Sequence, residues 1–359
     1  MTDLGSLRIA ELLTNARARG ASDLHFGGLI RPALRIDGRL IVLDDPAIDD
    51  TTVLSYLRDS LPAHGMLRLE QQGTIDGTLR STTIGPHRVH AYRQLGGVRV
   101  VVRFLARLVP TLESLELPPV LATFTTRPNG LILFTGPTGS GKTTALAGMI
   151  DRINRSLERS ILTVEDPIEY VHAPVRSIIA HCEIGRDVAD YHEALRGAMR
   201  ADPNVLLVGE MRDRATMQAA MTAAETGHLV FATLHTNDAP QTVDRIVDSF
   251  SSDAHNQIRS QLANVLHAIV SMRLVARKQN AGRRAVTEIL IATDAVRNLI
   301  REGKTHQLRN AIVTGRNVGM QTLETHLSEL VMRGEIDFTQ AQAVSTHPAD
   351  LRGLERAAV

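Results

Sequence analysis

The sequence predicts an α/β protein: a parallel β-sheet with crossover helices, preceded by a smaller domain of mixed α and β structure. Three observations support this fold class. From residue 131 onward, short apolar runs alternate with helical patterns of about 10–15 residues, which is typical of a parallel sheet. A glycine-rich phosphate-binding motif directly follows the first of these runs. Residues 1–106 contain instead pairs of apolar-alternating segments around short turns, which predicts β-hairpins.

The N-terminal region, residues 1–106, is expected to form helices and hairpins. The segment LRIAELLTNARARG is amphipathic and predicts a helix that ends at Gly20. PALRIDGRLIVL predicts a hairpin around the turn pair Asp37–Gly38, and HRVHAYRQLGGVRVVVRFLA predicts two more strands joined across Gly96–Gly97. Residues 107–120 carry three prolines and no strand period, so we interpret them as a linker.

The larger region contains the segments expected to build the parallel sheet. Its predicted strands are residues 131–135, 160–164, 204–209 and 228–234. Between them, DYHEALRGAMRA begins with Asp190 and has Glu193 three residues later, which resembles a helical capping box. Residues 255–359 are expected to be mostly helical, with one strand at 285–291.

Composition excludes several classes of protein. Hydrophobic residues make up 43% of the 359 residues, which is enough for a globular core. Forty Lys and Arg against thirty-nine Asp and Glu leave a net charge of +1, so we expect no nucleic-acid partner. The single cysteine, Cys182, rules out an internal disulfide and fits a reducing cytoplasm. No apolar run approaches the ~20 residues of a membrane-spanning helix, and the N-terminus does not read as a secretory signal.

The segment LILFTGPTGSGKTTALAGMI contains the pattern G-x-x-x-x-G-K-[ST] between a predicted strand and a predicted helix. Glycines let backbone amides turn toward phosphates, and the helix that begins near Lys142 adds its positive N-terminal end. Lys142 is expected to reach the terminal phosphates, and the Thr143 hydroxyl to bind Mg²⁺. The sequence therefore predicts that ATP and Mg²⁺ are bound by Gly136, Pro137, Thr138, Gly139, Ser140, Gly141, Lys142, Thr143 and Thr144.

Acidic residues follow two of the predicted strands. A P-loop ATPase needs one carboxylate that supports Mg²⁺ and another that orients and deprotonates the attacking water. The strand in NVLLVGEMRD supplies only Glu210, whereas ILTVEDPIEYVH delivers Glu165 to the same edge of a parallel sheet. We therefore predict Glu165 as the general base and Glu210 as the residue that supports the metal and the water. Asp166 and Glu169 either join this site or lie in a solvated turn.

Two histidines flank a third strand, in GHLVFATLHTNDA. His228 precedes the strand and His235 lies at its C-terminal edge. An imidazole at this position can hydrogen-bond a γ-phosphate and respond to its loss. We name both histidines as catalytic candidates, with ordinary polar histidines as the alternative; neither has the spacing of a zinc site.

Four segments together resemble the secretion ATPase superfamily. GPTGSGKTT, TVEDPIEYVH, ADPNVLLVGEMRD and AAETGHLVFATLHT are similar to its Walker A, Asp box, Walker B and His box, and they occur in the same order. Within that superfamily, ASDLHF (21–26), TAAETGHLVF (222–231) and AVRNLIREGK (295–304) resemble the type IV pilus retraction ATPases, the PilT family. The resemblance covers the chain from about residue 5 to about residue 340.

The resemblance implies a homohexameric ring motor that hydrolyses ATP to drive pilus retraction and twitching motility. It implies ATP bound between subunits and domains, an inner-membrane platform protein as partner, and a location at the cytoplasmic face of the inner membrane. It also allows a paralogous retraction ATPase as a partner, and it assigns required roles to Glu165 and Glu210. The implied domains are a PAS-like domain at 1–106, a linker at 107–120, a RecA-like ATPase core at 121–292 and a helical region at 293–359.

The family also brings arginines of the N-terminal domain to the phosphates. The candidates in this chain are Arg88, Arg93 and Arg103, although a strand arginine can equally be a solvated edge residue. Pro86 and His87 stand where the family commonly has Arg and Phe, so it is open whether this chain has an equivalent of one of the family's trans-acting arginines.

The segment AVRNLIREGK predicts an amphipathic helix, capped by Asp294 and ended by Gly303. Its apolar face is formed by Val296, Leu299 and Ile300, which leaves the polar side chains outward. In the family this helix is tied to retraction rather than to ATP hydrolysis, so the resemblance implies that it transmits motion or touches a partner. The alternative is an ordinary surface helix. The residues concerned are Arg297, Asn298, Leu299, Ile300, Arg301 and Glu302.

Three other functions compete with retraction. One is a pilus assembly or type II secretion ATPase of the same superfamily. It is disfavoured because MRLVARKQN lacks the cysteine pairs that those ATPases have after the matching position. The chain also lacks their long N-terminal extension. A nucleic-acid translocase predicts a basic pore, to which the net charge of +1 gives little support. An accessory ring that binds ATP and assists a sister motor is compatible with the motifs.

Overall fold

The computed structural model of the 359-residue chain describes residues 4–36, 38–61, 63–81, 83–105, 108–278 and 282–351. These residues form two compact units. The N-terminal unit comprises Met1–Leu108, Pro167–Val171 and Glu183–Ala189, and the C-terminal unit comprises Val109–Asp166, His172–Cys182 and Asp190–Val359. Asp37 of the predicted hairpin turn and the predicted boundary at residues 106 and 107 lie outside the described residues.

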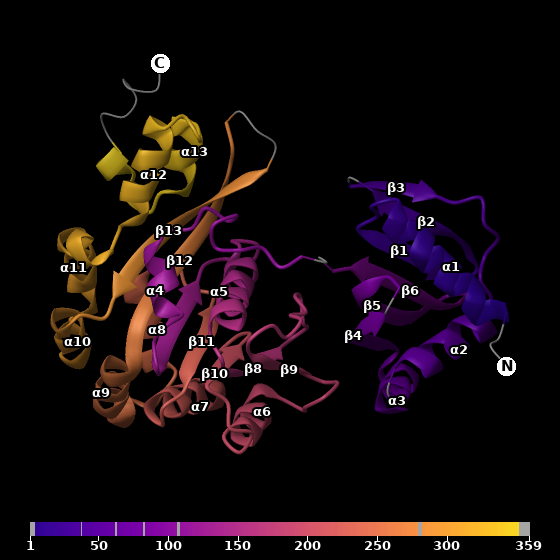
Figure 1. Cartoon of the computed structure of the whole chain (residues 1–359), viewed down its shortest axis with the longest axis horizontal. Helices are drawn as coiled ribbons and strands as arrows, with labels where there is room; N and C mark the ends of the chain where they lie inside the picture. The colour runs from indigo at the N-terminus through magenta and orange to yellow at the C-terminus, as the bar shows by residue number, and fades with distance from the viewer. Residues whose placement is uncertain are drawn as a thin grey trace. The chain divides into compact units, whose positions relative to one another are not determined.

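The N-terminal unit is built on a six-stranded sheet in the order β3-β2-β1-β6-β5-β4 (Figure 1). Every neighbouring pair in this sheet is antiparallel. The two predicted hairpins are confirmed, as β2–β3 and β5–β6. The strands are β1 Asp23–Gly27, β2 Ile30–Ile36, β3 Arg39–Val42, β4 Thr74–Ser81, β5 Gly85–Gln94 and β6 Gly97–Phe104; the helices are α1 Leu4–Ala18, α2 Asp50–Ser60 and α3 Ala63–Gln72.

Alternation along β6 decides which of its side chains face the core. Val98, Val100 and Val102 are buried and belong to one apolar cluster with residues of α1 and α2. Residues between these valines point to the opposite face, since successive side chains of a strand alternate. Arg103 lies on that face, and its direct neighbour across the β5–β6 ladder is Arg88. The strand period thus brings two of the candidate arginines together.

The C-terminal unit contains a seven-stranded sheet in the order β13-β12-β7-β11-β10-β8-β9 (Figure 1). All four strands predicted for the parallel sheet are present, as β7, β8, β10 and β11, and their mutual pairs are parallel. The strands are β7 Gly130–Thr135, β8 Ser160–Glu165, β9 Ile178–Glu183, β10 Val205–Val208, β11 Leu229–Leu234, β12 Leu266–Ala276 and β13 Arg283–Ile291. The α-helices are α4 Val120–Phe124, α5 Lys142–Ser156, α6 Tyr191–Ala198, α7 Arg214–Glu225, α8 Ala239–Asp248, α9 His255–Val265, α10 Asp294–Arg301, α11 Leu308–Thr314, α12 Leu323–Met332 and α13 Phe338–Val344.

Parallel register brings the C-terminal ends of four strands to one edge of this sheet. Val208 on β10 lies opposite Val164 on β8 and also opposite Ala232 on β11. Leu234, the last residue of β11, lies opposite Thr135, the last residue of β7. The residues that follow these positions therefore emerge side by side, which is where ligands bind in such sheets.

Strand β12 corrects the expectation that residues 255–359 are mostly helical with one strand. The segment LHAIVSMRLVA forms an 11-residue strand between β7 and β13, parallel to the first and antiparallel to the second. Most of its residues are buried. A continuous apolar run does not distinguish a buried strand from a buried helix, so only the packing of the sheet decides it.

Both faces of the C-terminal sheet are covered by helices. Alternate residues of β7 enter two different apolar clusters: Leu131 and Leu133 pack with residues of α7, α8 and α9, whereas Ile132 and Phe134 pack with residues of α5. Leu112 and Leu117, from the segment predicted as a linker, are buried in the α5 cluster. The structure is therefore a RecA-like α/β unit with a smaller N-terminal α+β unit. No helix in the described ranges has the length and apolarity that crossing a bilayer requires.

Candidate functional site

The glycine-rich loop connects the end of β7 to the start of α5. Gly136, Gly139 and Gly141 have φ angles of 138°, 78° and 93°, a region that side chains other than glycine rarely adopt. A Cβ atom on Gly136 would lie 2.4 Å from the Met272 carbonyl oxygen and 2.7 Å from Ser140 Oγ. The loop can therefore take this shape only if position 136 is a glycine.

Polar groups in this loop fit a phosphate. Lys142 is 7% exposed, and its Nζ donates to the carbonyl oxygens of Gly136 (2.7 Å) and Pro137 (3.0 Å). The Oγ of Ser140 is buried without a hydrogen-bond partner in the described part of the chain. The loop also precedes the N-terminus of a 15-residue helix, whose amides and dipole attract anions. The arrangement can cradle an anion that satisfies Ser140 and draws Lys142 away from the carbonyls.

Glu165 ends β8 directly beside the end of β10. Glu165 is buried, with 6% of its surface exposed. The backbone amide of Gly209, which follows β10, donates to Val164 O at 2.8 Å. A Cβ on Gly209 would lie 3.2 Å from Glu165 Cα, so glycine before Glu210 allows the two strand ends to pack closely. The sequence prediction that the two acids share one edge is supported by this contact.

Glu210 is held on both of its carboxylate oxygens. Arg212 Nη2 lies 2.8 Å from Oε2, and His235 Nε2 lies 3.3 Å from Oε1. The Glu210 side chain is 19% exposed. The hydrogen bond and the charge of Glu210 raise the pKa of Arg212. The ends of β10 and β11 thus converge, as predicted, and they bring both His235 and Arg212 onto Glu210, two contacts that the sequence did not predict.

Two more residues near Glu165 were missed by the sequence reasoning. Tyr191, the first residue of α6, has its hydroxyl 2.8 Å from the position a Gly209 Cβ would take, and burial, followed by Asp166, raises its pKa. His181 on β9 has Nδ1 2.8 Å from Thr163 Oγ1 and 3.9 Å from Glu165 Oε1. Neither residue belongs to a recognisable motif, because each comes from an element that reaches the site only in the folded sheet.

The other acids of the Asp box differ from Glu165 in their surroundings. Asp166 and Glu169 are exposed, whereas Glu165 is buried. Glu169 belongs to Pro167–Val171, a segment that packs within the N-terminal unit. Glu165 is therefore the buried acid at the end of β8, whereas the exposed Asp166 acts on Tyr191 and Arg212 through its charge.

The structure separates His228 from the other catalytic candidates. His228 precedes β11, and its carbonyl accepts from Gly130 N, at the start of β7 (2.9 Å). Its Nδ1 contacts Ala223 O at 2.9 Å. The full length of β11 lies between His228 and His235, so His228 sits at the edge opposite the phosphate loop. The expectation that it contacts the γ-phosphate is wrong for the site of its own chain.

The candidate arginines divide into a pair and a separate residue. Arg88 Nη2 lies 2.8 Å from Asp76 Oδ1, and Arg103 Nε lies 2.8 Å from Asp23 Oδ1. Arg88 and Arg103 both line a cavity of about 300 Å³ in the N-terminal unit, together with Phe104, Leu105 and residues 167–170. Arg93 does not line it; its Nε donates to Leu69 O at 3.4 Å.

The helix predicted from AVRNLIREGK is α10, and it differs from expectation in its cap. Thr293 is the N-cap residue, whose Oγ1 accepts from Val296 N at 3.4 Å. Asp294 is the first helical residue, so the prediction that it caps the helix is wrong. Val296 and Ile300 are buried, which confirms the predicted apolar face, and Gly303 follows with a φ of 69°.

Two arginines of α10 form hydrogen bonds to α9. Arg297 Nη1 donates to Asn264 O at 2.8 Å and to Ala263 O, and burial lowers the pKa of Arg297. Arg301 Nη2 donates to Asn264 Oδ1 at 3.0 Å. Cations at the C-terminal end of a helix satisfy its free carbonyls. The prediction that Arg297 is left outward is therefore wrong, whereas Arg301 is exposed as predicted. Asn298 and Glu302 are also exposed, and they bond each other along the helix (3.0 Å).

Comparison with known proteins identifies the family. The model of the type II/IV secretion system protein family matches residues 6–352. The chain is 41% identical over 340 residues to the type IV pilus retraction ATPase PilT of Pseudomonas aeruginosa, covering 95% of this chain and 98% of that protein. The chain belongs to the PilT family of type II/IV secretion system proteins.

Two further relatives extend this assignment. The PilT-family chain is 34% identical over 346 residues to the type IV pilus ATPase PilU of Pseudomonas aeruginosa, with 96% and 91% of the two chains covered. It superimposes on the crystal structure of the pilus retraction motor PilT with bound ADP at a TM-score of 0.88, with 39% identity and coverage of 97% and 99%. The comparisons therefore support an ATPase that binds a nucleotide.

Proposed function

We propose that this PilT-family chain is an ATP-hydrolysing motor that powers type IV pilus retraction. The observation that carries the proposal is the convergence of three strand ends, which brings Glu165, Glu210 and His235 to the edge where the phosphate loop lies. The similarity over nearly the whole chain to a pilus retraction ATPase supports the biological role.

The roles of the acids follow from their surroundings. Both carboxylate oxygens of Glu210 are engaged, by Arg212 and His235, so this side chain is suited to a fixed, supporting role. Glu165 makes no ion pair closer than 3.9 Å among the described residues, so its oxygens are available to a water molecule. In the proposed mechanism, Glu165 accepts the proton of the attacking water, a role that contributes about 10²–10⁴-fold to such reactions.

The remaining parts of the site hold the triphosphate. Backbone amides of residues 136–143 and the Lys142 ammonium bind the phosphate oxygens, and Thr143 together with Glu210 would hold Mg²⁺. Bound Mg²⁺ neutralises charge that develops on the phosphates. His235, at 3.3 Å from Glu210, links that carboxylate to the γ-phosphate and so reports its loss.

The proposed motor is a homohexameric ring in which catalytic groups come from more than one chain. Arg88 and Arg103 are the pair that fits such a contribution, because they lie side by side in one cavity of the N-terminal unit. We further propose a domain boundary near residue 106 and a helical region from residue 293. We also propose an inner-membrane platform protein as partner and α10 as the element that transmits motion. The ring would act at the cytoplasmic face of that membrane.

The central test replaces Glu165 by Gln. We expect ATP hydrolysis to fall at least ~100-fold, because the amide does not accept a proton, while cells still extend pili but no longer withdraw them. Asp166→Asn, at the adjacent exposed acid, is the matched control and should retain most of the activity. Loss of pilus extension in the Glu165→Gln strain would instead indicate an assembly motor.

A second experiment separates a main motor from an accessory one. The identity of 41% to PilT against 34% to PilU favours a main retraction motor. The chain should therefore restore twitching when it is the only retraction ATPase in a cell. Restoration only in the presence of a second retraction ATPase would assign it the accessory role.

A third experiment concerns the ring. ATPase activity per subunit should fall steeply on dilution below the assembly concentration, because the proposed site is shared. Unchanged specific activity in a verified monomer would contradict the shared site.

A further inference from the structure

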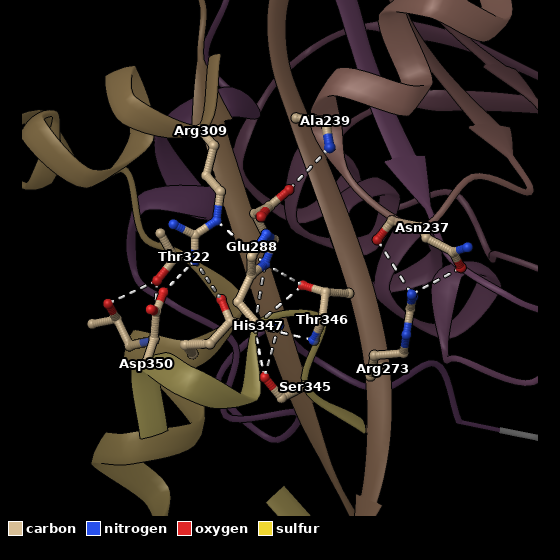
Figure 2. A network of polar contacts seen from close by, with 12 residues as sticks. Asn237, Ala239, Arg273, Glu288, Arg309, Thr322, Ser345, Thr346, His347 and Asp350 are labelled. Carbon is tan, nitrogen blue, oxygen red and sulfur yellow. Dashed lines mark hydrogen bonds and ion pairs between the residues drawn. The ribbon is translucent and has the colours of Figure 1, made fainter. Parts of the chain in front are cut away.

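The segment that follows His235 is anchored by two charged side chains from the far edge of the sheet. Residues 236–238 connect His235 to α8. Arg273, on β12, donates from Nη2 to Asn237 Oδ1 at 2.9 Å and to Asn237 O at 3.3 Å. Glu288, on β13, accepts from Ala239 N at 2.9 Å through Oε1 (Figure 2). This segment is thus bonded to β12 and β13 directly after a candidate catalytic residue.

The first turn of α8 and the segment before it are bonded as one body. Thr236 Oγ1 lies 2.7 Å from Thr242 Oγ1, and both residues are buried. Asp238 caps the helix by accepting from Gln241 N at 2.8 Å. A shift of the α8 N-terminus would therefore carry Thr236 with it, and Thr236 is the residue next to His235.

Glu288 is an unusual anchor because it is a buried acid. It is 5% exposed and stands in β13 opposite Ser271 of β12. A carboxylate at a helix N-terminus is favoured by the helix dipole, whereas its burial opposes the charge. The balance between these two effects decides how firmly Glu288 holds the Ala239 amide.

Charged groups face Glu288 from each element packed on it. Asp238 of the α8 cap and Glu324 of α12 are acidic, and Arg273 of β12 and Arg309 of α11 are basic. Arg309 is itself paired with Glu324 (3.3 Å) and with Asp350 (2.5 Å), as Figure 2 shows for its contact with Asp350. Burial is the largest effect and raises the pKa of Glu288 to about 7.

We propose that Glu288 is a positioning residue for His235, and that the charge on its buried carboxylate sets how firmly the segment 236–239 is fixed beside the nucleotide site. The inference rests on the proposed function of His235 and Glu210 in ATP hydrolysis. Glu288 acts through the α8 N-terminus, where it accepts a hydrogen bond from Ala239 N.

The proposal predicts a pH dependence. Below pH 7 the side chain is mostly a neutral acid, and above pH 7 it is a carboxylate, which accepts hydrogen bonds about twice as strongly. We therefore expect kcat for ATP to rise by about fivefold between pH 6 and pH 8, with the midpoint near the pKa of about 7. KM should change less than twofold, because the phosphate loop is untouched.

The test uses the full chain and its Glu288→Gln variant, which keeps the shape and one acceptor oxygen but has no charge. Its kcat should stay at the low-pH level throughout, so that it is about fivefold below the wild type at pH 8. The control is Glu335→Gln, which should keep the pH dependence. Glu335 pairs with Arg284 (2.9 Å), which lies on β13 like Glu288, but Glu335 contacts no residue of 235–239 in the described structure. Thermal unfolding of each protein confirms that it is folded at both pH values.

A second readout does not depend on activity. At pH 8, the amides of residues 236–242 should exchange with deuterium several-fold faster in Glu288→Gln than in the wild type, while those of α5 exchange equally. Equal exchange in the two proteins, or a kcat midpoint near pH 7 that persists in the variant, overturns the proposal. If the wild type does not hydrolyse ATP, the proposed function fails, and the exchange experiment alone decides whether Glu288 anchors α8.

Discussion

The two units of the molecule place their charged residues in different ways. In the C-terminal unit, Glu165 and Glu210 follow the ends of neighbouring parallel strands, and the register of the sheet fixes their proximity. In the N-terminal unit, Arg88 and Arg103 stand within strands on an outward face, where each pairs with an aspartate of the same sheet. The sheet backbone brings the two acids together, whereas the two arginines are held by the side chains of their aspartate partners.

This difference has an energetic consequence. The Arg88 and Arg103 side chains are 33% and 63% exposed, and ion pairs of this kind contribute about 0–1 kcal/mol. Arg88 and its partner Asp76 are both partly exposed, so this pair can be broken at little cost, whereas Asp23, the partner of Arg103, is buried (5% exposed) and is costly to leave unpaired. Glu165 is 6% exposed and belongs to a strand inside the sheet, so its position cannot adjust in the same way. We expect substitutions in the two units to differ accordingly.

The largest effect is expected at the phosphate loop. Lys142→Ala removes the buried ammonium that stands over Gly136 and Pro137, so ATP hydrolysis should fall at least ~100-fold. Lys278→Ala is the control, since Lys278 is a half-exposed lysine that pairs with Asp337 (3.3 Å). Steady-state phosphate release measures both. Hydrolysis within tenfold of the wild type in Lys142→Ala would show that the loop is not the site.

A smaller effect, on stability, is expected from the buried acid Glu288. Its pKa is raised from 4.5 to about 7, so the folded protein binds this proton more tightly than the unfolded chain. The corresponding stability is fully present below about pH 4.5 and is lost as the pH rises through about 7, a change of about 3 kcal/mol. Compared with Glu288→Gln, the wild type should lose about 2.5 kcal/mol of unfolding free energy between pH 5 and pH 8, because part of the change occurs below pH 5.

Urea denaturation at several pH values measures this difference. The exposed N-cap Asp49, whose pKa is lowered to about 2 by hydrogen bonds from Thr51 and Thr52, serves as the contrast in the N-terminal unit. Asp49→Asn should leave the pH dependence between 5 and 8 unchanged. Parallel pH profiles of the wild type and Glu288→Gln would contradict the burial argument.

The arginine pair is expected to affect activity more than stability. Arg88→Gln and Arg103→Gln should each reduce ATP hydrolysis by about tenfold, because a charged contact to a phosphate is lost. The unfolding free energy should change by less than ~1 kcal/mol in Arg88→Gln, whose partner Asp76 is partly exposed, and by more in Arg103→Gln, because the buried Asp23 loses its cation. Arg93→Gln is the matched control, since Arg93 lies on β5 outside the shared cavity. A tenfold loss in Arg93→Gln with none in the pair would reverse the assignment.

The smallest effect is expected when the partner of Arg88 is neutralised. Asp76→Asn weakens the contacts to Arg88 (2.8 Å) and His90 (3.1 Å), which are both partly exposed. The unfolding free energy should change by less than ~1 kcal/mol, and ATP hydrolysis should not decrease, because Arg88 is released rather than removed. A large loss of activity would show that the ion pair itself is needed.

Sequence-based prediction failed where a side chain meets a partner from a distant segment of the chain. Arg297 was expected to point outward from an amphipathic helix, yet it bonds the carbonyls of Ala263 and Asn264. The helical period places a side chain on a polar face but does not say which neighbouring helix end lies there. Tyr191 and His181 were missed for a related reason, because α6 and β9 approach Glu165 only through the order of strands in the sheet.

By itself, the sequence determined the phosphate loop, the hairpins and the parallel strands that carry Glu165, Glu210 and His235. These features depend on local conformation: glycines in the loop, apolar periods, and the rule that parallel strands end at one edge. Only the tertiary structure decided that LHAIVSMRLVA is the strand β12, that His228 lies at the edge opposite the loop, and that Glu288 meets the α8 amide. Those outcomes depend on contacts between segments far apart in the chain. The free energy of such contacts cannot be predicted from a local sequence pattern.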